Sequence, residues 1–185
     1  IAQICREAIP PEWQTLIFIK NERQALGIHA EIPDGTIVMA KRLTTKERLA
    51  VTEQVKQNLV KRCICSDVYS QGVTFHEVRA LINAGGGGGS ISCVQKPGRL
   101  AEIRPGKKCG VVIDVLWDPQ SSALKSMRHL PLTDALDMLP NPDANHWRAV
   151  VRDAWARHKI YEEKGYEISY HDDIASLTAF MKTCI

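Results

Sequence analysis

The residues best suited to chemistry lie in a basic stretch that follows a run of glycines. Gly85–Gly89 ends a short apolar run, and a cluster containing Gln95, Gly98 and Arg99 comes after it. The basic side chains of this stretch are Lys96, Arg99, Arg104, Lys107 and Lys108. Arginine presents a planar fork of donors that fits a phosphate, and lysine offers a compact positive charge. The stretch therefore predicts contacts with phosphate groups, and a solvated basic face is the alternative.

The sequence contains no phosphate loop of its own. A P-loop requires Gly-x-x-x-x-Gly-Lys-Ser/Thr, because its backbone amides hold the phosphates and its lysine reaches the outer two. Ser90 follows the glycine run directly, and Gly106-Lys107-Lys108 lacks the hydroxyl that would hold magnesium. Asp114 and Asp172-Asp173 superficially look like metal-holding acids, but a strand-end aspartate and a helix cap are the better interpretations. We expect that this chain does not hydrolyse ATP alone.

Three segments resemble motifs IV, V and VI of the second RecA-like domain of superfamily 2 helicases. Leu16–Lys20 (LIFIK) is similar to motif IV, the first strand of that domain. In CSDVYSQGVTFHEV, from Cys65 to Val78, Ser66 takes the motif V threonine position and Gln71-Gly72-Val73 matches Glu-Gly-apolar. Gln95-x-x-Gly98-Arg99 matches the start of motif VI. The resemblance extends from Leu16 to Ile168 and is closest to phage and bacterial repair or recombination helicases of the UvsW type.

The resemblance implies a division of roles among these residues. In this family ATP binds in a cleft between two RecA-like domains; the first supplies the P-loop and the metal-binding acid, and the second supplies arginines and part of the nucleic-acid surface. The implied catalytic residues are Arg99, Arg104 and Gln95; the implied nucleotide-side residues are Gly72, Gln71 and Gly98; and the implied nucleic-acid contacts are Ser66, Lys96, Lys107 and Lys108. ATP and Mg²⁺ are the implied cofactors, bound mainly by a first domain that this chain lacks. The implied partners are that N-terminal RecA-like domain and DNA or RNA.

Three departures from the family pattern keep a second interpretation open. Gln71 replaces Glu, Thr74 stands where the family has Asp, and Glu102 stands where the second motif VI arginine belongs, with Arg104 two residues late. A carboxylate at that position repels a γ-phosphate. The chain is therefore predicted to be the C-terminal half of an ATP-dependent helicase. The alternative is a non-catalytic nucleic-acid-binding or regulatory module derived from one, and a small nucleotide-binding enzyme is least favoured because no phosphate loop exists.

Short apolar runs alternate with helical patterns, which predicts an open, mostly parallel α/β sheet with helices on both faces, of the RecA-like type. The predicted strands are Leu16–Lys20, Thr36–Ala40, Cys63–Ser66, Ala80–Asn83 and Gly110–Trp117. Thr44-x-x-Glu47 has the spacing of a capping box, so a helix is expected over 45–60. A second helix is expected over Asn145–Lys164, stopped by Gly165, and a third through Met181, capped by Asp172 or Asp173.

Composition favours a single soluble domain. The chain has 185 residues, of which 44% are apolar, and a net charge of +3. Since that charge is too small to argue for nucleic-acid binding by itself, a basic surface must come from clustering. We expect one domain over residues 1–185, with 1–15 leading in and 145–185 forming closing helices. The N-terminus lacks a basic start and an apolar signal core, so we expect a cytoplasmic location, and it lacks an initiator Met, so we expect a piece of a longer protein. The resemblance to UvsW-type helicases implies a bacterial or phage-infected cell.

Two further features leave alternatives open. The run Gly85–Gly89 is either a flexible linker or a turn where backbones approach closely, and the helicase resemblance favours the turn. The six cysteines include no C-x-x-C pair, so reduced buried thiols are favoured over zinc. Cys63 and Cys65 are expected on one face of a strand.

Overall fold

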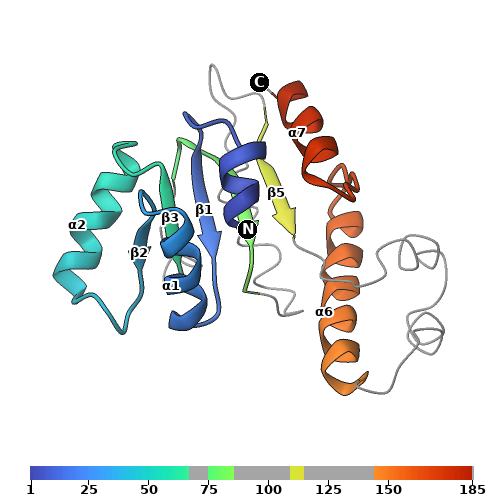
Figure 1. The fold of residues 1–185 in the computed structure, drawn as a ribbon, viewed down its shortest axis with the longest axis horizontal. Coiled ribbons are helices and arrows are strands. Elements are labelled where there is room, and N and C mark those ends of the chain that lie inside the picture. Colours follow the sequence, from blue (N-terminus) through green and yellow to red (C-terminus); the bar gives the residue numbers. More distant parts are fainter. Residues whose placement is uncertain (67–74, 86–108, 115–143, 185) are drawn as a thin grey trace. The chain divides into compact units, whose positions relative to one another are not determined.

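The computed structural model describes residues 1–66, 75–85, 109–114 and 144–184. Within these residues, five strands form one sheet in the order β2-β3-β1-β4-β5, and every neighbouring pair is parallel. Figure 1 shows the sheet with its helices. This is the predicted α/β fold of RecA-like type, so the fold class is confirmed. Parallel strands require crossover connections, which explains why the strands alternate with helices along the chain.

The strands lie close to the predicted ones. They are β1 (Gln14–Phe18), β2 (Thr36–Val38), β3 (Arg62–Cys65), β4 (Val78–Asn83) and β5 (Val111–Asp114). The central strand β1 begins two residues before the apolar run and ends two residues before Lys20. It is buried along its whole length, as expected for a parallel strand covered on both faces.

The helices match the predictions in part. The described helical elements are η1 (Ile4–Ala8, a π-helical turn), α1 (Glu22–Glu31), α2 (Thr45–Lys56), α6 (Ala144–Glu163) and α7 (Ile174–Thr183). The capping box of α2 is present, with Thr44 and Glu47 bonded reciprocally. Asp173 caps α7 by accepting a hydrogen bond from the Ser176 N–H at 2.7 Å. The structure adds α1 and η1, which the apolar pattern did not predict, and it ends α2 at Lys56 because Asn58 takes a left-handed conformation with φ of 60°.

The core on one face of the sheet packs against α2. Its buried members include Phe18 from β1, Cys63 and Cys65 from β3, Leu81 from β4 and Val55 from α2. The two thiols lie on one face of β3, as predicted, and both are buried. Right-handed crossovers explain the layering: the chain moves one way across the sheet through α1 and back through α2, so these helices cover opposite faces.

Gln14 connects the central strand to the end of α2. The residue is buried, and its side-chain amide nitrogen donates to the carbonyl oxygens of Val55 at 2.6 Å and Val60 at 2.8 Å. The Val55 carbonyl, in the last turn of α2, also accepts from the Asn58 N–H at 3.0 Å, so the Gln14 amide adds a second donor to it and reaches the chain beyond the helix at Val60. This explains why a polar residue begins the most buried strand of the sheet.

The described residues belong to two compact units. The first contains the sheet with η1, α1, α2 and α7, and the second contains residues 144–170 with α6. In the first unit α7 packs against η1, and the Thr178 hydroxyl lies 3.2 Å from the Glu7 carbonyl oxygen. In the second unit Gly165 ends α6 as predicted: its φ is +70°, and the N–H groups of Gly165 and Tyr166 donate to the carbonyls of Glu162 and Tyr161.

Candidate nucleotide and nucleic-acid edge of the sheet

The carboxyl ends of the five parallel strands form one edge of the sheet, which we call the carboxyl edge. Open parallel sheets bind ligands at this edge, at the place where the strand order reverses direction. The residues that leave the strands here are Lys20 after β1, Met39 after β2, Ser66 after β3, Ala84 after β4 and Asp114 at the end of β5. The fold therefore brings parts of the chain that are nearly one hundred residues apart to a common edge.

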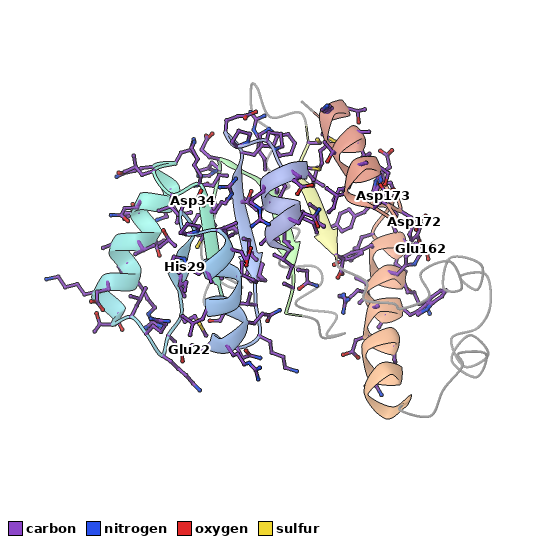
Figure 2. All side chains as sticks on the ribbon, viewed as in Figure 1. Glu22, His29, Asp34, Glu162, Asp172 and Asp173 are labelled. Atoms are coloured by element: carbon purple, nitrogen blue, oxygen red, sulfur yellow. The ribbon has the colours of Figure 1, made fainter. Side chains whose placement is uncertain are left out.

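Two helices begin at the carboxyl edge. Asn21 caps α1 by accepting from the Gln24 N–H at 2.9 Å, and Thr44 caps α2. Glu22, in the first turn of α1, lies 3.4 Å from the Arg42 guanidinium, so the two helix starts are also linked by charge; Figure 2 labels Glu22 at the start of α1. Both helices direct the positive ends of their dipoles to this edge, which favours anions there.

The strand order reverses between β1 and β4. The connection from β1 leads towards β2, whereas the connection from β4 leads towards β5, so a crevice is expected between their ends. Gln24 spans this place: its side-chain oxygen accepts from the Lys20 N–H at 2.9 Å, and its nitrogen donates to the Ala84 carbonyl at 2.7 Å. Gly85 lies directly against β1, because a Cβ placed on it would be 3.2 Å from the Ile19 carbonyl carbon.

The first glycine of the run therefore occupies a close approach between backbones. This close approach fits the turn interpretation at Gly85, and Gly86–Gly89 lie outside the described residues.

A polar pair ends the two strands on the other side of the crevice. Asn83 is buried, and its side-chain nitrogen lies 3.4 Å from an Asp114 carboxylate oxygen. The strand register places the two residues side by side on neighbouring strands. Asp114 is thus a strand-end aspartate, as interpreted from the sequence, and Asp173 is a helix cap.

Of the predicted site residues, the described part of the chain includes Ser66. Ser66 follows the last residue of β3, is partly buried, and its N–H donates to the Val38 carbonyl at 3.4 Å. The residue expected at the motif V position thus lies at the carboxyl edge. The remaining predicted residues lie outside the described residues; they are Gln71, Gly72, Gln95, Lys96, Gly98, Arg99, Arg104, Lys107 and Lys108.

Sequence reasoning missed the part of this edge built by Asn21 and Gln24. Asn21-x-x-Gln24 has the same spacing as Thr44-x-x-Glu47 and directly follows an apolar run, so the capping signature was present in the sequence. The hydrogen bond from Gln24 to Ala84 had no sequence signal, because it joins residues sixty positions apart.

Other chemistry in the described part of the chain is limited. No group of three or more His, Cys, Asp or Glu side chains among these residues could hold a metal ion. Burial raises the pKa of the Cys5 thiol, which keeps it protonated and disfavours a nucleophilic role. None of the described helices has the length and apolar character needed to cross a membrane.

The strand order and the absence of a P-loop from the sequence together define a class of protein. This class is the RecA-like α/β domains, which act at the carboxyl edge of a parallel sheet. The chain belongs to the helicase conserved C-terminal domain family, whose model matches residues 2–104. A comparison with curated protein sequences gave no match.

Solved structures share this fold. The C-terminal domain of Saccharomyces cerevisiae Dbp5 bound to Gle1 and IP6 is 15% identical with a TM-score of 0.62, and the match covers 99% of this chain and 88% of that one. A longer Dbp5 chain bound to RNA and ADP BeF3 is 18% identical with a TM-score of 0.60; the match covers 93% of this chain but spans 38% of that one. A DEAD box protein from Methanococcus jannaschii is 22% identical with a TM-score of 0.52, over 68% of this chain and 35% of its own.

One finer expectation is left without support. The predicted closeness to UvsW-type repair helicases has no support among these neighbours, while the broader assignment to helicase C-terminal domains is confirmed.

Proposed function

We propose that this chain is the second RecA-like half of an ATP-dependent nucleic-acid helicase or translocase. It closes on a first domain that holds ATP and Mg²⁺, supplies Arg99 to the γ-phosphate, and contributes part of the nucleic-acid surface. The observation that carries the proposal is the family match over residues 2–104 in a sequence that has no P-loop. A domain that contacts a nucleotide held by another domain explains both the family match and the missing P-loop.

The geometry of the carboxyl edge supports the proposal. Two helix N-termini and the exits of the five described strands meet there, and the helix dipoles favour an anion at this edge. Ser66 lies at this edge at the end of β3, where the family resemblance places a contact to the nucleic-acid backbone. In the longer Dbp5 structure the ligands are RNA and ADP BeF3. We therefore propose RNA or DNA as the strand, and the first RecA-like domain as the partner.

Salt-dependent binding tests the nucleic-acid role. Each neutralised phosphate releases counterions, so affinity for a labelled single strand should be micromolar or weaker and should fall steeply with salt, on the order of non-specific binding. Replacing Lys107 and Lys108 with alanine should weaken binding and reduce the salt slope by about one for each lysine–phosphate interaction that is removed. Arg99→Ala should weaken it less, because the proposed partner of Arg99 is the nucleotide.

The control for this titration removes two lysines from elsewhere on the surface. Lys159 and Lys182 are exposed on α6 and α7, so Lys159→Ala with Lys182→Ala makes the same change in net charge. Fluorescence anisotropy across a salt series measures the affinity of both double variants for the labelled strand. Affinity that stays flat with salt, or an equal decrease of slope in the control, would contradict the proposed contacts.

A second candidate function is a non-catalytic nucleic-acid-binding module. The observation that favours it is Glu102 at the position of the second motif VI arginine, since a carboxylate repels the γ-phosphate. Glu102→Arg, in the chain joined to a first RecA-like domain, separates the two candidates. A helicase half that already functions should hydrolyse ATP before the change, whereas a module should gain turnover only with the arginine, if at all.

Two finer predictions accompany the proposal. We propose that residues 1–185 act as one domain and that the protein works in the cytoplasm of a bacterial or phage-infected cell. Limited proteolysis followed by calorimetry of the fragments tests the first, because a single domain unfolds in one cooperative transition.

A further inference from the structure

The side chain of Gln24 uses its two ends for different tasks. Its oxygen accepts from the Lys20 N–H at 2.9 Å, which extends the N-terminal cap of α1. Its nitrogen donates to the Ala84 carbonyl at 2.7 Å, on the chain leaving β4. Capping requires only the acceptor, because the orphan groups at a helix start are N–H donors. The donor end therefore has a task that helix stability does not explain.

The second task is at the place where the strand order reverses. The Ala84 N–H continues the sheet ladder by donating to the Phe18 carbonyl at 2.8 Å, so Ala84 is held from both sides. Gly85 then passes within contact distance of the Ile19–Lys20 peptide. The crevice expected between β1 and β4 is thus bridged by the protein's own side chain, and the exit of β4 is fixed relative to the start of α1.

We propose that Gln24 is a positioning residue that holds the exit of β4, and with it the start of the glycine run, against the β1–α1 turn. The functional meaning of this role rests on the proposed function, because the chain that leaves β4 leads in sequence to Gln95, Gly98 and Arg99. Gln24 touches neither nucleotide nor nucleic acid in this role. It sets the point from which that segment departs.

Gln24→Glu separates the two tasks of the side chain. A carboxylate keeps the length and the acceptor for Lys20, and it suits the first turn of a helix because of the dipole. It cannot donate to the Ala84 carbonyl and repels that oxygen instead. Hydrogen exchange measured residue by residue by NMR on the 185-residue chain should show the Ala84 amide exchanging about tenfold faster, while amides of α1 and of the β1–β3 ladder stay unchanged.

Acid should reverse the effect. A protonated glutamic acid donates through its O–H, so the ratio of variant to wild-type exchange at Ala84 should fall towards one as the pH drops below about 4.3, the ordinary glutamate pKa. Gln54→Glu, at an exposed position on α2, is the control for added charge and should leave Ala84 unchanged. A residue that only caps α1 would show neither the local acceleration nor its reversal.

The outcomes distinguish this role from the proposed function. Unchanged exchange at Ala84, or equal acceleration throughout α1, overturns the positioning role of Gln24. A wild-type chain that shows no salt-dependent binding of a single strand contradicts the proposed function, and it leaves the exchange result to decide the role of Gln24. Local acceleration that acid reverses supports the inference.

Discussion

Two glycines of the first unit differ in what surrounds the position of their missing Cβ. Gly27 lies inside α1 with nothing within 4 Å of that position, whereas at Gly85 the backbone of Ile19 lies 3.2 Å away. Backbone cannot rotate aside as a side chain can. The same substitution should therefore have opposite effects at these two positions.

Gly27→Ala should raise the free energy of unfolding by about 0.5–1 kcal/mol, because glycine is costly inside a helix. Gly85→Ala should lower it by about 1–3 kcal/mol, the range for overpacking a close contact. Urea denaturation of both variants measures the difference. If Gly85→Ala is as stable as Gly27→Ala, the close approach of Gly85 to β1 is wrong.

The place of Ser66 in the fold could be predicted from the sequence, whereas its role stays a prediction. The threonine-like position of Ser66 follows an apolar strand, and its place at the carboxyl edge is a consequence of parallel pairing. The role of Gln24 was not predictable, because glutamine at this spacing indicates a cap and says nothing of Ala84. Interactions between residues that are distant in sequence depend on the topology of the fold, and local sequence patterns carry no information about that topology.

At the scale of elements, two helix caps contain carboxylates whose titration is altered. The hydrogen bond from the Thr44 side chain, together with the Thr44 backbone N–H, lowers the pKa of Glu47. Hydrogen bonds from Ser176 lower the pKa of Asp173, the backbone N–H contributing most. A carboxyl group whose pKa is lower in the folded state stabilises the fold above its unfolded pKa, and this stabilisation disappears as the pH falls through the folded pKa.

Replacing both capping carboxylates by amides should therefore make the stability of the fold fall less steeply as the pH is lowered. The double variant Glu47→Gln with Asp173→Asn keeps an acceptor at each position, since both amides have a carbonyl oxygen. Its melting temperature should fall less than that of the wild type between about pH 5 and about pH 2. Glu163→Gln, an exposed change at the end of α6, is the control. If the melting temperature of the double variant falls as much as that of the wild type over this pH range, the two caps do not contribute to the loss of stability in acid.

The elements that sequence patterns missed share a weak apolar signal. In α1 the buried residues are Ala25 and Ile28, Leu26 is exposed, and Gly27 has low helix propensity, so the apolar pattern is too weak to predict a helix. Conversely, β1 begins at two polar residues, Gln14 and Thr15, and Gln14 donates to the Val55 carbonyl in α2 and to the Val60 carbonyl beyond it. The long, strongly periodic α6 was predicted within one residue at each end.

At the scale of the molecule, a family member without a P-loop should not turn over nucleotide. We expect phosphate release from ATP by this chain to stay at background, with or without single-stranded DNA or RNA, because γ-phosphate stabilisation by an arginine requires a nucleotide held by another domain. A coupled phosphate assay measures it, and Arg99→Ala serves as the contaminant control. Turnover that disappears in Arg99→Ala would contradict the two-domain proposal.

The position of β1 at the centre of the sheet has a consequence for how the chain is made. Of the five strands, the ribosome produces β1 first, but its two neighbours, β3 and β4, are complete only at Cys65 and Asn83. Until β3 is made, a nascent chain carries a largely apolar strand with two unpaired edges, and until β4 is made one edge stays unpaired, a feature that promotes aggregation. Contacts between distant residues also slow folding. Synthesis beyond residue 83 is thus a threshold, and nascent chains that stop short of it should need a chaperone's protection.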